Sequence, residues 1–464
     1  MRYRFVDRSL ELEILDREYR STGLRLVVVY GRRRVGKTYL LNYFSRDKNR
    51  VFFIAIETSK SILYRELSKA VSQWLGKPIG TLDNLEDVLD LIRREARDRV
   101  VVVLDEFQYL VEADPEAVSR LQRFIDTHPD ANLMIVICGS AVSFFEKELL
   151  GYRSPLFGRR TASIKLKPMR FLDVWNFYPR YSALEAIYAY SAFGGTPAYA
   201  QHVDDTVDVF TNIAHKILSR GSYLYDEALN FFRQEVREPS TYIAILSAIA
   251  HGYTRPSEVA SIAGVTSKSI SRYIELLEHL DIVERIRSLG RRRGEVRLEI
   301  VDPYFFFWFR FVKPRFSLLE QGYTYEVLEE VKKSYDTYVA SVVEMLVRRE
   351  LIHEIIARGL VEGELGVVGK WWYRGEEIDV VVQGTTRTVF AEVKWSDLSL
   401  REAMSIAREL EAKASVSGLQ KSSNIYVVIA RRVEECKPLC REGPYVAMDL
   451  LKLLSYLRAN RVKL

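Results

Sequence analysis

The sequence lacks any run of about 18 consecutive apolar residues, the length that a membrane-spanning helix requires. Its opening, MRYRFVDRSLELEIL, alternates charged with apolar residues and has no apolar core of a signal peptide. Disorder is excluded as well, because hydrophobic residues make up 48% of the chain and charged residues 28%. We therefore expect a folded cytoplasmic protein without membrane segments.

Cysteine, asparagine and glutamine are scarce, with 3 Cys, 9 Asn and 8 Gln in 464 residues. A shortage of thermolabile residues beside abundant charge is typical of thermophilic proteins. Cys138 lies in the apolar run LMIVICGS, which predicts a buried thiol. Cys436 and Cys440 are spaced as C-x3-C, but no second Cys or His pair lies nearby to complete a zinc site. Two unreactive thiols are the favoured interpretation, and a local disulfide is the alternative.

The excess of positive charge is small, because 68 basic residues face 62 acidic ones and leave a net charge of +6. This excess permits binding to nucleic acid but does not require it. Of the basic residues, 48 are Arg and 20 are Lys. Arginine makes planar contacts to phosphate and to carboxylate, so this bias suits both nucleic-acid binding and ion-pair networks.

Residues 1–165 alternate short β-branched runs with amphipathic stretches, which is typical of a parallel α/β sheet. Several runs are apolar throughout, as strands buried on both faces should be. The expected strands are Leu26–Tyr30, Val51–Ile56, Val100–Leu104, Leu133–Cys138 and Ser163–Leu166.

Residues 31–38, GRRRVGKT, match the phosphate-binding pattern G-x-x-x-x-G-K-[ST] at every fixed position, between an expected strand and an expected helix. Backbone N–H groups of such a loop surround a phosphate, and the helix N-terminus adds the positive end of its dipole. We expect Lys37 to reach the β- and γ-phosphates of ATP and the Thr38 hydroxyl to ligate Mg²⁺. The residues expected to bind the nucleotide are Gly31, Arg32, Arg33, Arg34, Val35, Gly36, Lys37, Thr38, Tyr39 and Asp105.

The run VVVVLDE ends in two acids, as a strand that serves a nucleotide site should. We expect Asp105 to hold Mg²⁺ and Glu106 to act as the general base for the attacking water. The alternative is a strand that ends in solvated acids.

Two further residues are candidates for the same reaction. Ser140 follows the next strand and could contact the γ-phosphate or orient the water. Arg159, in the segment PLFGRR, could act as an arginine finger toward its own nucleotide or that of a neighbouring subunit. A surface turn with ion pairs is an equally good interpretation of this segment.

These motifs together resemble the archaeal ATPases of the AAA+/STAND grouping. The matching segments are FVDR near the start, GRRRVGKT, LDEFQ, CGS, PLFGR and GGTPAY. The resemblance covers about the first 240 residues and implies an ATP-binding core with a helical lid, whose opening segment packs near the nucleotide base. Signalling members usually carry an arginine at the sensor strand, whereas Gly139-Ser140 stands there in this chain.

Residues 240–302 are typical of a winged helix, with three helices followed by a hairpin. The second and third helices are separated at Gly264, and the third buries Ile270, Ile274, Leu277 and Leu280. The residues that such a domain would present to the DNA groove and phosphates are Lys268, Ser269, Arg272, Arg291, Arg292 and Arg293. Winged helices also serve as protein-contact modules, so DNA and a protein partner are alternatives.

The C-terminal segment contains two expected strands joined by a turn at Thr385-Thr386. A symmetric turn there makes the numbers of paired residues sum to 771, so that Asp379 faces Glu392 across the hairpin. Lys394 lies on the same face as Glu392, because side chains alternate along a strand. Two acids and a lysine on one face are costly unless they bind a cation or are solvated.

This I-D…E-V-K pattern resembles the PD-(D/E)xK nuclease fold. The resemblance implies that Asp379 and Glu392 ligate Mg²⁺, that Lys394 positions or activates water, and that Glu344 assists from the preceding helix. The alternatives are a surface hairpin with ion pairs, and an inherited nuclease fold that only binds.

The sequence therefore predicts an α/β protein: a P-loop (ASCE/AAA+) parallel-sheet domain with a helical lid, a winged helix-turn-helix domain and a C-terminal α/β restriction-endonuclease-like domain. The expected segments are 1–170 for the ATPase core, 171–239 for the lid, 240–302 for the winged helix, 303–333 for an aromatic linker and 334–464 for the nuclease-like domain. The favoured function is ATP-dependent DNA processing. The alternative is a nucleotide-gated switch that binds DNA or a protein and cuts nothing, either as a homo-oligomer or with another partner.

Overall fold

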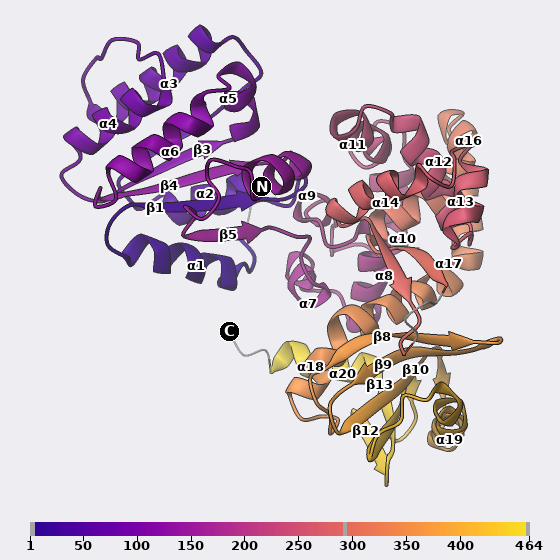
Figure 1. Cartoon of the computed structure of the whole chain (residues 1–464). Coiled ribbons are helices and arrows are strands. Elements are labelled where there is room, and N and C mark those ends of the chain that lie inside the picture. The colour runs from indigo at the N-terminus through magenta and orange to yellow at the C-terminus, as the bar shows by residue number, and fades with distance from the viewer. Residues whose placement is uncertain (1–4, 291–294, 461–464) are drawn as a thin grey trace. The chain divides into compact units, whose positions relative to one another are not determined.

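The computed structural model describes residues 5–290 and 295–460 (Figure 1). The chain divides into two compact units, and the boundary in sequence falls between Pro168 and Met169. Within the described residues, every helix is too short or too polar to cross a membrane. The expected tip of the wing, Arg291–Arg293, lies outside the described residues.

The first unit is built on a sheet of five parallel strands in the order β2-β3-β4-β1-β5. The strands are β1 (Arg25–Tyr30), β2 (Arg50–Ile54), β3 (Val100–Asp105), β4 (Leu133–Gly139) and β5 (Ala162–Lys165). The helices of this unit are α1 (Ser9–Arg20), α2 (Lys37–Ser45), α3 (Lys60–Leu75), α4 (Leu85–Glu95), α5 (Phe107–Ala113), α6 (Ala117–Thr127) and the π-helical turn η1 (Phe144–Leu149).

All five expected strands are present, and β3 and β4 are buried along their whole length. Because the sheet is parallel, the carboxyl ends of β1, β3 and β4 meet at one edge. Since β4 lies between β1 and β3, the residue that follows β4 lies between the phosphate-binding loop and the acids of β3. This edge is where the ATP site was expected.

The second unit begins with a set of short helices. They are α7 (Phe171–Val174), η2 (Trp175–Phe177), α8 (Ala183–Phe193), α9 (Pro197–Ala200), α10 (Val209–Ile213), η3 (Ala214–Leu218) and α11 (Glu227–Glu235). A second helical set follows the wing: α15 (Pro303–Phe307), η4 (Trp308–Val312), η5 (Lys313–Arg315), α16 (Phe316–Glu320), α17 (Thr324–Leu346), η6 (Val347–Leu351) and α18 (Ile352–Ala357).

The aromatic segment 303–333 is part of this helical core and not a linker. Tyr304 and Trp308 are almost wholly buried, and their polar atoms bond to the first helical set. The Tyr304 hydroxyl donates to the Leu224 carbonyl over 2.9 Å, and the Trp308 indole donates to the Tyr225 carbonyl over 2.8 Å. A helix that is apolar on all sides requires burial on all sides, which a linker does not provide.

Residues 239–300 have the expected order of three helices and an antiparallel strand pair. The elements are α12 (Pro239–Ala250), α13 (Pro256–Ile262), α14 (Ile270–His279), β6 (Val283–Arg287) and β7 (Val296–Ile300). The expected buried stripe is confirmed, with Ile270, Ile274, Leu277 and Leu280 all buried. The third helix begins at Ile270, because Thr266–Ser269 form a turn in which the Ser269 N–H bonds to the Thr266 side chain.

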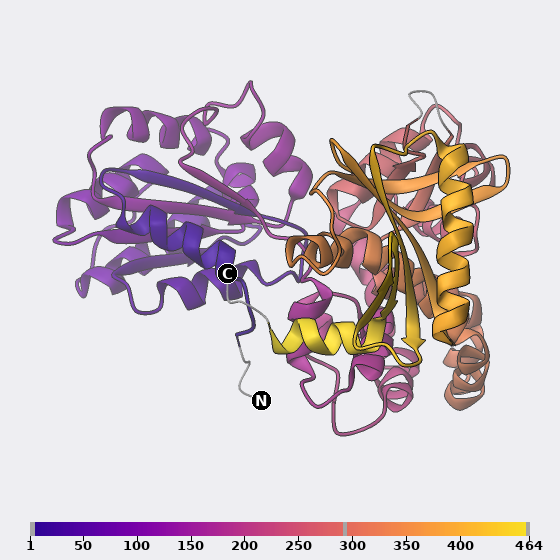
Figure 2. The same cartoon turned by 90° about the horizontal axis from the view of Figure 1, so that it is seen from below.

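The C-terminal part is a mixed six-stranded sheet in the order β12-β13-β11-β10-β9-β8. Its elements are β8 (Val367–Tyr373), β9 (Glu376–Gln383), β10 (Arg387–Leu398), α19 (Leu400–Ser417), β11 (Ser423–Val433), β12 (Leu439–Glu442), β13 (Tyr445–Asp449) and α20 (Leu450–Ala459). Figure 2 shows α19 along one side of this sheet, with α18 and α20 on the other.

The wing is docked on the edge strand β8 of this sheet (Figure 1). The Leu289 N–H donates to the Lys370 carbonyl over 2.9 Å. Ser288 is buried and bonds with both the N–H and the carbonyl of Trp372, at 3.0 and 3.1 Å. These backbone contacts make the winged segment and the C-terminal sheet parts of one compact unit.

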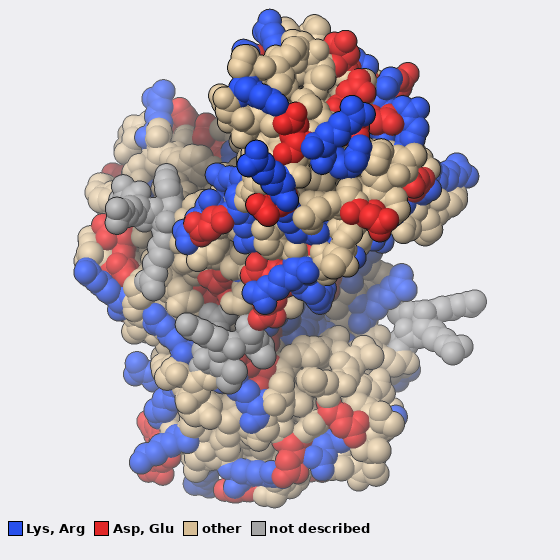
Figure 3. Space-filling view, turned by 90° about the vertical axis from the view of Figure 1, so that its left-hand side faces the viewer, with Lys and Arg blue, Asp and Glu red and all other residues tan. Residues whose placement is uncertain are grey.

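Positive and negative side chains are interspersed on the face of the molecule shown in Figure 3. This mixture agrees with the small net charge of +6. Nucleic-acid binding must therefore be argued from local sites and not from a broad positive field.

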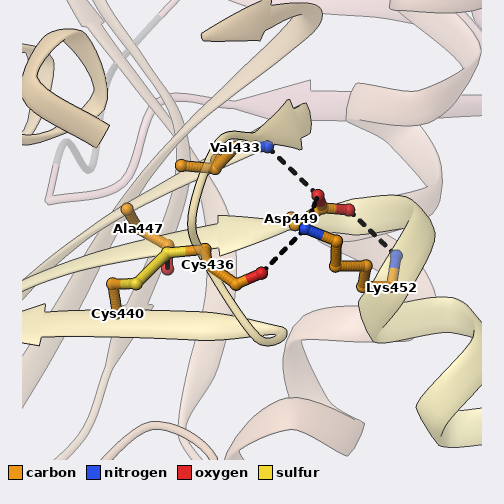
Figure 4. Close-up of a disulfide and its surroundings, with 6 residues drawn as sticks. All are labelled: Val433, Cys436, Cys440, Ala447, Asp449 and Lys452. Atoms are coloured by element: carbon orange, nitrogen blue, oxygen red, sulfur yellow. Dashed lines mark hydrogen bonds and ion pairs between the residues drawn. A yellow bond between two sulfur atoms is a disulfide. The ribbon is translucent and has the colours of Figure 1, made fainter. Parts of the chain in front are cut away.

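Cys436 and Cys440 form a disulfide (Figure 4), so the interpretation as two free thiols is wrong. The bond joins the loop after β11 to β12, and Lys452 of α20 donates to the Cys436 carbonyl over 2.8 Å. Spacing alone could not separate a disulfide from free thiols, because the closeness depends on a turn that brings the two residues together. Cys138 is buried as expected.

The aromatic core provides a test of stability at the helix cap Asp302, which is buried. Its Oδ1 accepts from the N–H groups of Tyr304 and Phe305 at 2.9 and 3.2 Å. We expect Asp302→Ala to lower the free energy of unfolding by about 1–2 kcal/mol, because these donors lose their partner. Thermal denaturation measures the change. Asp302→Asn keeps a capping oxygen and should stay close to the wild type; equal losses in both variants would contradict the capping role.

Candidate functional site

The phosphate-binding loop connects β1 to α2. A side chain at Gly31 would place its Cβ 2.2 Å from the Leu166 carbonyl oxygen, so only glycine fits there. Gly36 has φ +94°, a conformation that glycine adopts without strain. These two glycines let the loop turn tightly into the N-terminus of α2.

The loop lysine and threonine both bond to neighbouring groups of the site. The Lys37 ammonium donates to the carbonyls of Gly31 and Arg32 at 2.8 and 3.0 Å. The Thr38 hydroxyl donates to Asp105 Oδ2 over 2.5 Å, which joins the loop to the end of β3. Thr38 and Asp105 are therefore a pair of oxygen ligands that fit Mg²⁺.

Glu106 is held by residues from two neighbouring segments. Its Oε2 accepts from the Ser140 hydroxyl over 2.9 Å and from the Gln108 amide. Glu106 has φ +51°, an uncommon conformation for a residue with a side chain. Strain of this kind concentrates where a side chain must be held for function.

Ser140 was expected to contact phosphate or water, and the structure places its hydroxyl on Glu106. Gln108 is part of the LDEFQ motif but was given no role there, and it is 4% exposed. Gly139 explains the close fit, because a Cβ there would lie 2.1 Å from the Gln108 side-chain oxygen. The glycine at the end of the buried strand β4 was the sequence feature that could have indicated the contact between Gln108 and Glu106.

The opening segment packs on the loop helix α2. The Phe5 ring stacks on Tyr43 with centroids 3.9 Å apart and lies 5.8 Å from that of Tyr39. The Arg8 guanidinium donates to the Val35 carbonyl over 3.1 Å. Aromatic faces next to a phosphate-binding loop suit a nucleotide base.

Arg159 is not positioned to act on the nucleotide of its own chain. It makes a two-point ion pair with Asp126 at 2.7 and 2.9 Å. Thr161 follows and donates to the Leu26 carbonyl at the start of β1, which is the sheet edge opposite the phosphate-binding loop. The structure supports the interpretation of this segment as a surface turn with ion pairs, and corrects the arginine finger in cis.

The C-terminal hairpin has the expected register. Thr388 pairs with Gln383, and the numbers of the successive pairs sum to 771 as far as Ala391 with Val380. The next pair would be Glu392 with Asp379, and there the Val393 N–H donates to Asp379 Oδ2 over 2.8 Å. Asp379 thus lies beside Glu392 at the end of the paired region.

Among the described residues, Glu344, Glu377 and Asp379 offer carboxylate oxygens within 4.8 Å of one another. Burial raises the pKa of Asp379 to about 7, with further contributions from Glu344 and Glu392. Burial likewise raises the pKa of Glu344. Both charged carboxylates are therefore costly in this group, and a divalent cation with oxygen ligands would relieve that cost.

Glu392 lies next to this group but is bonded elsewhere. It is 6% exposed, and its Oε1 accepts from Lys394 over 2.8 Å, while Lys413 lies 3.5 Å away. Its Oε2 is buried with no hydrogen-bond partner among the described residues. An orphaned buried oxygen is a ready ligand for a cation.

Sequence reasoning missed Glu377 and Lys370. Lys370 forms ion pairs with Glu344 and, at 3.5 Å, with Glu377. Burial lowers the pKa of this lysine, but Glu344, Glu299 and Glu377 outweigh that effect and the pKa is raised. The sequence offered one sign that these residues lie near Asp379: residues 370, 377 and 379 fall on the two strands of one hairpin, β8 and β9.

Three of the residues expected to contact DNA, Lys268, Ser269 and Arg272, lie at the N-terminal end of α14 or in the turn before it. Lys268 and Arg272 are exposed, and Ser269 is half-buried in the turn described above. Arg272 donates to the Tyr273 hydroxyl over 2.9 Å and lies over that ring. Arg291, Arg292 and Arg293 stay predictions, because they lie outside the described residues.

Comparison with known proteins supports two parts of this description. Residues 5–203 match a family described as an ATPase domain predominantly from Archaea. Residues 308–406 match a family described as archaeal and bacterial proteins of unknown function. An uncharacterized protein of Methanocaldococcus jannaschii is 29% identical over 437 residues, covering 93% of this chain and 96% of its own length.

Shorter and more distant similarities were also found. An uncharacterized ATP-binding protein of Methanocaldococcus jannaschii is 48% identical over 44 residues, which is 10% of this chain and 75% of that protein. The Walker-type ATPase of Pyrococcus abyssi has a TM-score of 0.49 and 20% identity, covering 66% of this chain and 96% of that one. The ORC2 protein of Aeropyrum pernix, in complexes with ADPNP and ADP, has a TM-score of 0.40 and 13% identity, covering 70% of this chain and 94% of that one. The chain is thus similar, over residues 5–203, to an ATPase domain found predominantly in Archaea and, over residues 308–406, to archaeal and bacterial proteins of unknown function.

Proposed function

We propose that the chain hydrolyses ATP at the phosphate-binding loop and cuts DNA, with Mg²⁺, in its C-terminal domain. The observation that supports the second activity is the crowding of Glu344, Glu377 and Asp379 within 4.8 Å, beside the buried free oxygen of Glu392. These three residues are half-buried, and burial raises the pKa of Asp379 to about 7, so their charged forms together are costly without a cation. Within the proposal, α14 and the wing bind the DNA.

In the ATP reaction, each residue acts on a different part of the substrate. The Lys37 ammonium exchanges its two carbonyl contacts for phosphate oxygens, and Thr38 and Asp105 hold Mg²⁺, which would neutralise charge on the phosphates. Glu106 accepts the proton of the attacking water. Ser140 and Gln108 keep the Glu106 carboxylate in place through the hydrogen bonds described above.

Lys37→Ala and Glu106→Gln should lower ATP turnover for different reasons. Lys37→Ala should weaken nucleotide binding, because no ammonium group then reaches the phosphates. Glu106→Gln should bind ATP normally and slow hydrolysis by about 100-fold or more, the scale expected when a general base is removed. Steady-state phosphate release and nucleotide titration separate these effects. Wild-type turnover in Glu106→Gln would show that another group is the base.

In the C-terminal domain, Asp379, Glu344 and Glu377 would supply oxygen ligands, and Glu392 lies beside Asp379 on the neighbouring strand. The bound ion would stabilise charge on a scissile phosphate and lower the pKa of a water ligand. Burial lowers the pKa of Lys394, but its bond to Glu392 outweighs burial and the pKa is raised. Lys394 is therefore a cation that orients water and stabilises negative charge, and not a general base.

A divalent ion should stabilise the chain through these carboxylates. We expect Mn²⁺ or Mg²⁺ to raise the Tm of the nucleotide-free full chain. At an ion concentration of 100 times Kd, the free energy of unfolding should rise by about 2.7 kcal/mol. Asp379→Asn should remove most of this rise. Asp105→Asn is the matched control at the ATP site and should keep it. A full metal-dependent rise in Asp379→Asn would exclude the C-terminal carboxylates as the metal site.

Cleavage is tested with plasmid and branched DNA in Mg²⁺ or Mn²⁺, with and without ATP. Lys394→Ala should lose cleavage yet keep the metal-dependent rise in Tm, because the lysine is not a ligand. Glu392→Ala serves as the second inactive variant. Metal binding without cleavage by the wild-type chain would favour the alternative, a nucleotide-gated protein that binds DNA and does not cut it.

A further inference from the structure

A cavity of about 390 Å³ lies between the wing and the hairpin of β8 and β9. This volume is within the range of about 300–1,000 Å³ that is usual for ligand pockets. Its lining comes from two separate parts of the second unit, the winged segment and the C-terminal sheet. The lining residues are Arg255, Glu295, Arg297, Trp372, Tyr373, Arg374, Gly375, Glu376 and Glu377.

Three arginines approach the cavity from different directions. Arg297 of β7 lies over the Trp372 ring, with its guanidinium carbon 4.3 Å from the ring centroid. Arg374 lies 5.1 Å over the Tyr373 ring, in a two-residue turn where Arg374 and Gly375 have φ +50° and +91°. Arg255 comes from the start of α13 and pairs with Glu295. Guanidinium groups braced on aromatic rings are pre-organised to bind planar or tetrahedral anions.

The cavity shares Glu377 with the carboxylate group. The Arg297 Nη1 donates to Glu377 Oε2 over 3.1 Å, and the Glu377 carboxylate lies within 4.8 Å of those of Glu344 and Asp379. An ion bound by Glu377 would compete with Arg297 for this carboxylate. The arginine would then need another anion, and that anion would lie close to the ion.

We propose that this cavity binds the phosphate of a nucleotide unit, with Arg297 and Arg374 on its oxygens and the Tyr373 ring stacked on the base. A phosphate diester satisfies both sides of the cavity, because its oxygens accept from arginine and can also ligate a metal. A peptide carboxylate satisfies the arginines but offers nothing for the aromatic ring to stack on. This proposal rests on the proposed nuclease function in one respect: that function identifies the bound nucleotide as part of a DNA strand.

The test is direct binding of fluorescein-labelled dT12 to the full chain in Ca²⁺, an ion with oxygen ligands that can occupy the carboxylates. Binding is measured by anisotropy, and gel analysis verifies that the strand stays intact. Arg297→Gln and Arg374→Asn should each weaken binding by about tenfold, the scale of one charged hydrogen bond. Asparagine suits the positive φ of position 374 better than alanine does. The slope of log Kd against log salt should also fall by about 0.7 for each phosphate that the variant no longer binds.

Arg180→Gln is the matched control, because it removes the same charge from an exposed residue of the first helical set, which neither lines the cavity nor belongs to α14 or the wing. It should change binding by less than about threefold. Equal losses in Arg180→Gln, or no loss in the two cavity variants, would overturn the proposal. Arg374→Asn decides the matter if Arg297→Gln lowers the Tm, since Arg297 also joins the wing to Glu377.

Competition with dTMP distinguishes a nucleotide within a DNA strand from a free nucleotide as the ligand of the cavity. A strand ligand predicts that dTMP competes only at concentrations far above the Kd of dT12, and a free-nucleotide ligand predicts comparable affinities. Cavity-dependent binding of dT12 by a chain that does not cut DNA would support this proposal and reject the nuclease. Cleavage that persists with unchanged dT12 binding in both cavity variants would reject this proposal alone.

Discussion

The second unit depends on how it balances four carboxylates that lie close together, three of them half-buried and one, Glu392, buried. Glu344, Glu377, Asp379 and Glu392 come from a helix and two strands, and burial raises the pKa of Asp379 to about 7. The balance is supplied by cations from four elements: Lys370 on β8, Lys394 on β10, Lys413 on α19 and Arg297 on β7. Most of these pairs connect one element to another, so the charges that suit a metal site also hold the domain together.

The ATP site meets a different constraint, which is the geometry of a parallel sheet. Carboxyl ends of neighbouring strands lie at one edge, and this places Thr38, Asp105 and Glu106 together without any buried excess of charge. Hydrogen bonds do the positioning: Thr38 on Asp105, and Ser140 with Gln108 on Glu106. The two candidate sites thus use the same residue types, but the carboxylates of the C-terminal site come from three elements and are paired with lysine and arginine side chains.

Local patterns in the sequence were enough to predict the strands of the first unit and the register of the C-terminal hairpin. The five strands follow from apolar runs, and the pairing sum of 771 follows from a symmetric turn, because register in a hairpin is set by its turn. Contacts between distant segments could not be predicted in this way. Ser140 on Glu106, Arg159 on Asp126 and Arg297 on Glu377 join residues that only the packing of whole elements brings together. The aromatic segment 303–333 was misjudged because a run of large apolar residues does not show which surface will cover it.

The ion pairs between the wing and the C-terminal domain have a consequence for how the two act. Arg348 pairs with Glu299 and Arg349 with Glu284, in addition to Arg297 with Glu377. Arg348 is buried, and breaking a buried pair by removing one partner costs about 3–5 kcal/mol. The β6–β7 pair is therefore joined to η6 through two of these pairs and to the sheet that carries the carboxylates through the third. Within the proposed function, a DNA strand held by α14 or by the β6–β7 pair would meet the carboxylates at a fixed distance.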